Sequence, residues 1–305
     1  MNAPLALTPS QLVIQPPLHA SFLGMMRGEF VKIARLFWLG LAILAIVFVV
    51  RFGLGASAPG VKADLQSTPL HFLYTAVESN LLVFRICSGL FLLVLTSFTI
   101  GWEYQYGTIR VLLARGAGRV QLLLAKLAVL VLLSLILLAV FTLLTALLTC
   151  VQMFALVGNL DALSALTPVF WSNSGIDLLT VIINLGATIL LATAMNALGR
   201  SLAVGLSASL IWFPLDNAGT LIMNTLARVT QSDAWLNTTA YFLGPLLNHL
   251  PDMLLPAEAQ TESESFGVRP LVPVSGLHAV FVIGAYSLVF LLLALFSTWK
   301  RDVKE

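Results

Sequence analysis

Long apolar runs separated by short polar segments dominate the hydrophobic pattern of the chain. An apolar run of about 18 or more residues without charge is long enough to cross a bilayer as a helix. The pattern predicts six transmembrane helices, at about 34–54, 80–101, 124–151, 177–198, 200–222 and 275–298. The third and sixth are the clearest, because no Asp, Glu, Lys or Arg occurs from Leu127 to Leu160 or from Pro270 to Trp299. We therefore expect an all-α integral membrane protein.

Two of the expected spans carry polar residues at their limits. Arg35 and Arg51 bound the first span, and the residues between them are too few to cross a core of about 30 Å. Both arginines must extend toward the membrane surface, or the bilayer must thin locally. The fifth span has a similar limit at Asp216, and we expect its helix to continue past Pro214 with a kink.

The rest of the chain divides around these spans. Residues 1–20 hold four prolines and are expected to form a flexible tail, and residues 21–305 form a single six-span domain. The largest segment outside the spans is the loop at about 223–274, expected on the extracytoplasmic side. Its apolar half could form short helices that lie on the outer membrane face or cap the bundle.

Composition and charge agree with a membrane protein and orient it. Hydrophobic residues make up 59% of the chain and charged residues 10%, which is too little charge to cover a soluble protein of this size. If the N-terminus lies inside, eleven of the sixteen Lys and Arg residues fall on the inner side. Because inner loops of membrane proteins are enriched in Lys and Arg, we expect both the N-terminus and the C-terminus to be cytoplasmic.

The sequence lacks the usual catalytic and cofactor sites. No lysine follows a glycine, so the chain has no phosphate-binding P-loop, and any ATP must be hydrolysed by a separate subunit. An intramembrane serine protease would need Ser207 and His278 to meet, but their expected depths in the membrane differ too much. The small residues around Ser207 are expected to allow close helix packing instead. We predict no catalytic residue, no metal site, no cofactor bound by this chain and no nucleic-acid partner.

Three polar residues inside the expected spans are candidates for a pathway or gate. Arg85 either extends to the outer headgroups or forms part of an outer gate or a contact to an anionic substrate. Asn184 and Asn196 either bond between helices or contact a substrate.

The segment 103–126 concentrates basic residues between the second and third spans. Thr108 can cap a short helix, in which Ile109, Leu112 and Leu113 share one face. Arg110 and Arg115 point away from that face, so we expect an amphipathic helix at about 103–119 on the cytoplasmic membrane surface. A basic connector that only enforces topology would explain its cations but not its apolar face.

This segment resembles the coupling-helix region of type 2 ABC transporter permeases. The residues that carry the resemblance are Glu103, Gly107, Thr108, Arg110, Leu112, Leu113, Arg119 and Lys126. The family often has a proline in the turn that is Gly116-Ala117-Gly118 here. The stretch MMRGEFVKIARLFW resembles the amphipathic interfacial helix before the family's first span, with Glu29 and Lys32 on one face, and LALFSTWKRDVKE resembles its basic tail. The Glu-Ala-Ala loop typical of importers is absent, which favours export.

The resemblance implies a permease subunit of an exporter in the cytoplasmic membrane of a prokaryote. Two permease subunits, identical or different, would form the pathway in the lipid bilayer, and a separate ABC ATPase that binds ATP and Mg would dock on 103–126. The implied ATPase-coupling residues are Glu103, Gly107, Thr108, Ile109, Arg110, Leu112, Leu113, Arg115 and Arg119. The implied N-terminal interface consists of Glu29, Lys32 and Arg35. The alternative is a membrane anchor or scaffold subunit of another complex, without transport activity.

Overall fold

The computed structural model describes residues 21–56, 60–106, 118–256, 259–260 and 267–300. These residues form helices and connecting turns, with no strand among them, so the all-α prediction is confirmed for the described chain. The long helices are α1 (Phe22–Ala56), α3 (Pro69–Gln105), α5 (Arg119–Val157), α6 (Pro168–Gly199), α7 (Leu202–Thr230) and α11 (Gly276–Lys300). The short α2 (Val61–Ser67) and the 3-10 helix η2 (Asp161–Ala165) lie in the connections at one end of the bundle.

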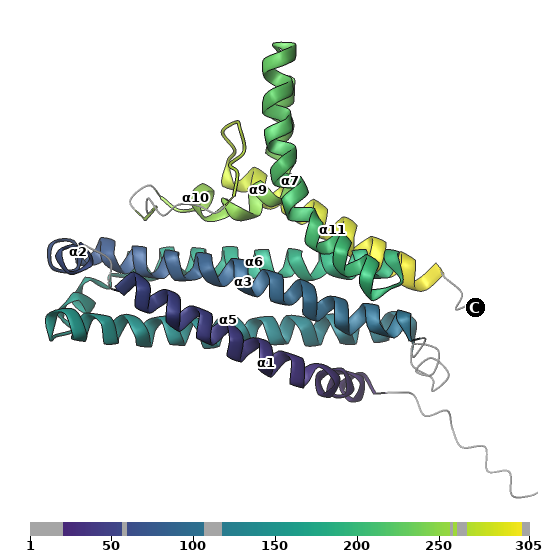
Figure 1. Cartoon of the computed structure of the whole chain (residues 1–305), viewed down its shortest axis with the longest axis horizontal. Helices are drawn as coiled ribbons and strands as arrows, with labels where there is room; N and C mark the ends of the chain where they lie inside the picture. The colour runs from purple at the N-terminus through teal and green to yellow at the C-terminus, as the bar shows by residue number, and fades with distance from the viewer. Residues whose placement is uncertain (1–20, 57–59, 107–117, 257–258, 261–266, 301–305) are drawn as a thin grey trace, which may run out of the picture.

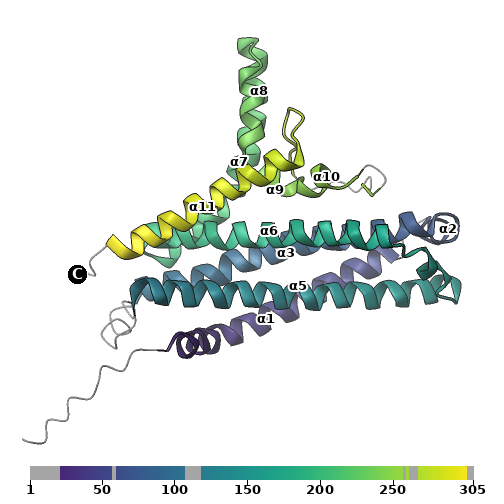
Figure 2. The same ribbon diagram turned by 180° about the vertical axis from the view of Figure 1, so that it is seen from behind.

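Four long helices, α1, α3, α5 and α6, run side by side along the long axis of the molecule (Figure 1). Helix α6 packs against α3, α5, α7 and α11. Figure 2 shows the same bundle from behind, with the start of α1, the end of α3 and the end of α11 at one end. Both ends of the described chain therefore lie at the same end of the bundle.

Five helices of the described chain are long and apolar enough to cross a membrane, namely α1, α3, α5, α6 and α11. They correspond to five of the six expected spans; α1, α3, α5 and α6 extend beyond the predicted bounds at both ends, and α11 begins at Gly276 and extends beyond its predicted end. Helix α7, which contains the expected span 200–222, is not among the five. Asp216 and Asn217 follow Pro214 closely and interrupt its apolar stretch. A crossing by α7 therefore remains a prediction.

Helix α7 continues past Pro214, as predicted for that segment. Its first part follows the bundle and its second part projects away from it (Figures 1 and 2). A proline inside a helix removes one backbone hydrogen bond and favours such a bend. The amphipathic helix expected ahead of the first span is not separate, because α1 runs without interruption from Phe22.

The expected loop 223–274 begins inside α7 and continues as a series of short helices. These are α8 (Ala234–Thr238), the 3-10 helix η3 (Thr239–Tyr241), α9 (Leu243–Asn248) and α10 (Leu250–Leu254). Leu243, Leu246 and Leu250 are fully buried against α6 and α11. The expectation that the apolar half of this loop forms short helices is confirmed, and these helices pack on the bundle.

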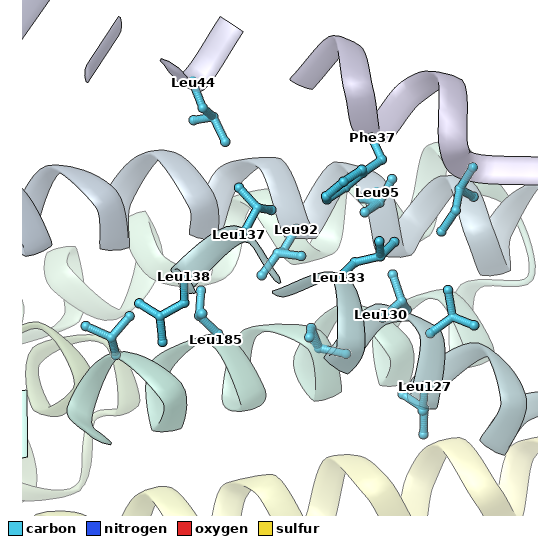
Figure 3. Close-up of a cluster of buried hydrophobic side chains, with 14 of the residues drawn as sticks. Phe37, Leu44, Leu92, Leu95, Leu127, Leu130, Leu133, Leu137, Leu138 and Leu185 are labelled. Atoms are coloured by element: carbon cyan, nitrogen blue, oxygen red, sulfur yellow. The ribbon is translucent and has the colours of Figure 1, made fainter. Parts of the chain in front are cut away.

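Leucines and phenylalanines fill the main core between α1, α3, α5 and α6 (Figure 3). Leu92, Leu95, Leu130, Leu133 and Leu137 are fully inaccessible to solvent. A second cluster joins α6, α9 and α11. The core therefore holds α6 in contact with both halves of the molecule.

Helices α3, α6 and α7 approach closely where their small residues meet. The turn between α6 and α7 places Arg200 in the left-handed region, with φ of 52°, and the Ser201 hydroxyl accepts a hydrogen bond from the Val204 amide at 3.1 Å. A Cβ atom on Gly205 would overlap the side chain of Asn196. Close packing of the small residues near Ser207 was expected, and at Gly205 the structure confirms it.

Candidate functional site

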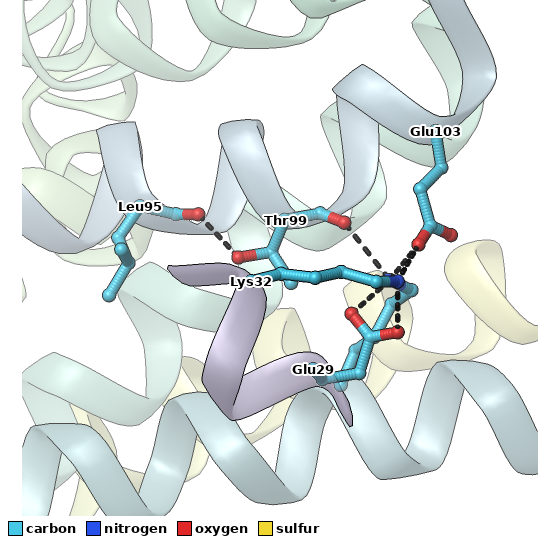
Figure 4. Close-up of polar contacts among 6 residues, drawn as sticks. Glu29, Lys32, Leu95, Thr99 and Glu103 are labelled. Carbon is cyan, nitrogen blue, oxygen red and sulfur yellow. Dashed lines mark hydrogen bonds and ion pairs between the residues drawn. The ribbon is translucent and has the colours of Figure 1, made fainter. Parts of the chain in front are cut away.

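Four charged residues meet where α1, α3 and α5 come together at one end of the bundle (Figure 4). The Lys32 ammonium lies 2.7 Å from Glu29 Oε1 and 2.7 Å from Glu103 Oε1. The Lys126 ammonium lies 2.6 Å from Glu29 Oε2 and 2.9 Å from Glu103 Oε1. Each lysine therefore bridges both carboxylates, and we call these four residues the charge cluster.

Burial makes the charge cluster a joint between helices. Glu29, Lys126 and Glu103 are 3%, 4% and 7% exposed, whereas the Lys32 side chain is half exposed. Two ammonium groups and two carboxylates balance, so the cluster carries no formal net charge. A buried ion pair adds little net stability compared with apolar residues, but removing one partner costs about 3–5 kcal/mol. The charge cluster therefore joins α1, α3 and α5, and the loss of any one partner would leave a buried charge without its counter-ion.

The backbone contributes a further bond to the cluster. Lys126 also donates to the carbonyl oxygen of Thr99, at 3.1 Å. The Thr99 hydroxyl in turn donates to the Leu95 carbonyl at 2.7 Å, as Figure 4 shows. The ammonium of Lys126 thus has three acceptors, which is the full number that it can use.

Two members of the charge cluster, Glu103 and Lys126, stand at the two ends of the segment 103–126 that was expected to dock the ATPase. Glu103 stands near the end of α3, and Arg119 is the first residue of α5. Between them, Gly107, Thr108, Ile109, Arg110, Leu112, Leu113 and Arg115 lie outside the described residues. Glu103 faces its own bundle, because its Oε1 already bonds Lys32 and Lys126. Arg119 is half-buried.

The expected N-terminal interface residues separate into two groups. Glu29 and Lys32 belong to the charge cluster, and they lie three positions apart on one face of α1, as expected. Arg35 is exposed on the same helix and is not a member of the cluster.

The candidate pathway residues also separate. Arg85 and Asn184 line one cavity of about 330 Å³ between α3, α6 and α7. Arg85 is only 7% exposed, so its side chain is buried between helices and does not extend to the surface. Asn196 lies elsewhere and bonds between helices, since its amide donates to the Ser97 hydroxyl of α3 at 2.9 Å. The same amide also donates to the Ala192 carbonyl of its own helix at 2.8 Å.

The protease alternative receives no support from the geometry. His278 lies with Nε2 3.2 Å from the carbonyl oxygen of Ala240, and its ring packs edge-on against Tyr241. Ser207 is exposed on α7. Among the residues that the structure describes, no group of three or more His, Cys, Asp and Glu side chains could hold a metal ion.

Sequence reasoning did not identify three of the residues at these sites. Lys126 was matched to the coupling motif, but its place in the charge cluster was not predicted. A lysine at the start of a long charge-free helix needs a buried partner, and that signal points to it. Asn217 and Asn248 line the cavity with Arg85, and only the folding of 223–274 back onto the bundle brings Asn248 there.

Comparison with known proteins adds one match. A family model described as ABC-2 family transporter protein matches residues 25–214. This range is more than half of the chain, and it contains the charge cluster together with Arg85 and Asn184. A comparison with curated proteins found no match.

Proposed function

The chain belongs to the ABC-2 family of transporter proteins, and on that premise we propose that it is the permease subunit of an ATP-binding-cassette exporter. It is a multi-pass membrane protein. In the proposal, two permease subunits form the pathway, with α7 as a sixth crossing in each and both termini in the cytoplasm. A separate ATPase subunit binds ATP and Mg and docks on 103–126. The membrane is the cytoplasmic membrane of a prokaryote.

The observation that carries the proposal is the position of the charge cluster. Glu103 and Lys126 are the first and last residues of the proposed dock, 103–126. The two side chains bond directly to each other at 2.9 Å, and both bond to α1. A force applied to the segment between them therefore reaches α1, α3 and α5 together.

The proposed mechanism is mechanical. ATP binding closes the ATPase dimer and displaces the docked coupling segments. Arg110, Arg115 and Arg119 pair with acidic residues of the ATPase, while the apolar face of the segment fills a groove on it. The charge cluster passes the displacement to three helices. The displacement can open the pathway only if the bundle has two stable arrangements, one closed and one open to the outer side.

Export, and not import, is inferred from the cytoplasmic segment. Its Gly-Thr start and apolar face match the coupling region of the type 2 permeases, and the Glu-Ala-Ala loop of importers is absent from the sequence.

The proposal is tested by purifying the full chain from its host in a mild detergent and identifying the proteins that accompany it. We expect an ABC ATPase in stoichiometric amount, and we expect its ATP hydrolysis in vesicles to depend on the chain. The control is an unrelated polytopic membrane protein with the same tag. Purification of the chain with other membrane proteins, but with no ATPase, would reject the permease and favour a scaffold subunit.

A further inference from the structure

The cavity that contains Arg85 has an unusual combination of walls. Most of its lining is apolar, including Leu90 and Leu93 of α3 and Phe213 of α7. One buried cation, Arg85, stands among these side chains with a few amides. Binding sites for small organic molecules have this character, with apolar walls and a small number of polar groups that orient the ligand.

The guanidinium of Arg85 lacks the partners that a buried cation needs. Its Nε and Nη1 atoms are fully buried and have no hydrogen-bond partner among the described residues. A guanidinium stays charged in proteins and offers five N–H donors, so leaving buried donors unpaired is costly. Asp177, Glu78 and Asp252 act on Arg85 electrostatically, without bonding to these two atoms. An anionic group entering the cavity would satisfy the unpaired donors.

Three Asn side chains line the cavity, and two of them, Asn217 and Asn248, already contact other parts of the protein. Asn217 donates to the Phe213 carbonyl at 2.9 Å and accepts from the Val268 amide at 3.2 Å. Asn248 lies against Gly267, near the same segment. The side-chain amide of Asn184 has no hydrogen bond to another described residue, so it can bind a ligand together with Arg85.

One edge of the cavity opens toward the exposed surface of the helices. Leu90 and Leu210 line it and are 52% and 37% exposed. In a membrane protein, apolar side chains exposed on such helices face lipid or another subunit. An apolar chain can therefore pass this edge while a charged group stays at Arg85.

We propose that this cavity binds a single-chain amphipathic organic anion and, given the proposed exporter function, that such anions are the exporter's cargo. The anionic group bonds to the guanidinium of Arg85, with the Asn184 amide as a further donor. The alkyl body lies along Leu93 and Phe213. A carboxylate and a phosphate share the geometry that a guanidinium binds with two parallel hydrogen bonds.

The test uses dodecanoate with a photoreactive diazirine on its chain, in phosphatidylcholine vesicles that contain the full chain. Cross-linked peptides are identified by mass spectrometry, and the matching diazirine dodecanol is the neutral control. We expect dodecanoate to label peptides of α3 and α7 and dodecanol to label them weakly. In the Arg85→Gln variant the amount of dodecanoate labelling should fall about tenfold or more, because hydrogen bonds to charged groups are stronger than those between neutral groups. Arg85→Lys should retain part of it.

Two further variants separate a binding defect from a folding defect. Arg228→Gln makes the same change on an exposed residue of α7 outside the cavity and should label as the unchanged protein does. Gly89 lines the cavity, and a Cβ atom there meets nothing within 4 Å. Gly89→Leu should therefore fill the cavity and reduce labelling while Arg85 stays in place. Equal labelling by dodecanoate and dodecanol, or unchanged labelling of Arg85→Gln, would overturn the proposal.

Competition identifies the source of the anion, and the ATPase assay separates the two proposals. Unlabelled dodecanoate and dodecyl phosphate should both compete, whereas phosphatidylglycerol added to the vesicles should not; competition by phosphatidylglycerol alone would overturn the single-chain ligand. Labelling without a copurifying ATPase would keep the anion site and reject the exporter. A normal ATPase complex with no Arg85-dependent labelling would keep the exporter and reject the site.

Discussion

The ammonium of Lys126 lies 2.6 Å from a carboxylate oxygen of Glu29, although 97 positions separate the two residues in the sequence. Both side chains are almost fully buried. This bond joins α1 to α5 at the last residue of the segment 103–126, which we propose as the ATPase dock. The pair therefore connects the first described helix with the proposed coupling segment.

Replacing Lys126 with Met should destabilise the bundle by about 3–5 kcal/mol, because the two buried carboxylates would lose their buried cation and keep only the half-exposed Lys32. Thermal unfolding of the purified protein in detergent measures the effect, and Arg35→Met, on the exposed side of α1, is the control. A double change of Glu29→Gln with Lys126→Met should cost less than the sum of the two single changes. If the changes in unfolding free energy of the two single variants simply add in the double variant, the Glu29–Lys126 bond does not contribute to stability.

Changing Arg110 and Arg115 to Glu should abolish association with the ATPase, because acidic residues on the partner would then meet like charges. Copurification and ATP hydrolysis in vesicles give the two measurements. Arg228→Glu reverses an exposed charge on α7 and should leave both unchanged. If the double variant still binds and stimulates the ATPase, the coupling helix is assigned to the wrong segment.

Gly205→Ala should lower the stability by about 1–3 kcal/mol, because the new methyl group would overlap Asn196 and force α6 and α7 apart. Thermal unfolding measures the loss. Gly284→Ala is the matched control on α11, where a Cβ atom meets nothing within 4 Å. Equal stability of the two variants would mean that α6 and α7 are less closely packed than the structure indicates.

Asp216→Ala should release the start of α9, because the carboxylate of Asp216 accepts the Gly244 amide at 2.8 Å. We expect faster hydrogen exchange over 243–248, measured by mass spectrometry. A loss of about 1.5–3 kcal/mol is typical of hydrogen bonds to charged groups. The exposed Asp233, whose side chain caps no helix, provides the control as Asp233→Ala. Unchanged exchange would show that apolar packing alone holds α9.

The crossing by α7 can be tested with single cysteines after Cys87 and Cys150 are changed to Ser. A membrane-impermeant maleimide should label Asp233→Cys on intact cells and Lys304→Cys only after permeabilisation, since Lys and Arg gather on the inner side. Labelling of Asp233→Cys only after permeabilisation would place the end of α7 in the cytoplasm and refute the six-span topology.

The sequence by itself determined the helical membrane class and the place of five long helices. A run such as Leu127–Leu160 contains no charged residue and favours the lipid interior over water. In lipid, the backbone N–H and C=O groups of such a single segment can all form hydrogen bonds only within a helix. The same local information marked the basic segment around Arg110. These features depend on neighbouring residues along the chain, so they are readable without a fold.

The tertiary structure decided which polar residues meet. The sequence marked Arg85, Asn184 and Asn196 alike as candidates for a pathway or gate, but helix packing places the first two on one cavity and leaves Asn196 bonded to Ser97. It also turned Glu103 toward Lys126 and Lys32. Such partners depend on the rotation and depth of several packed helices, and periodicity along one helix does not encode the face of another.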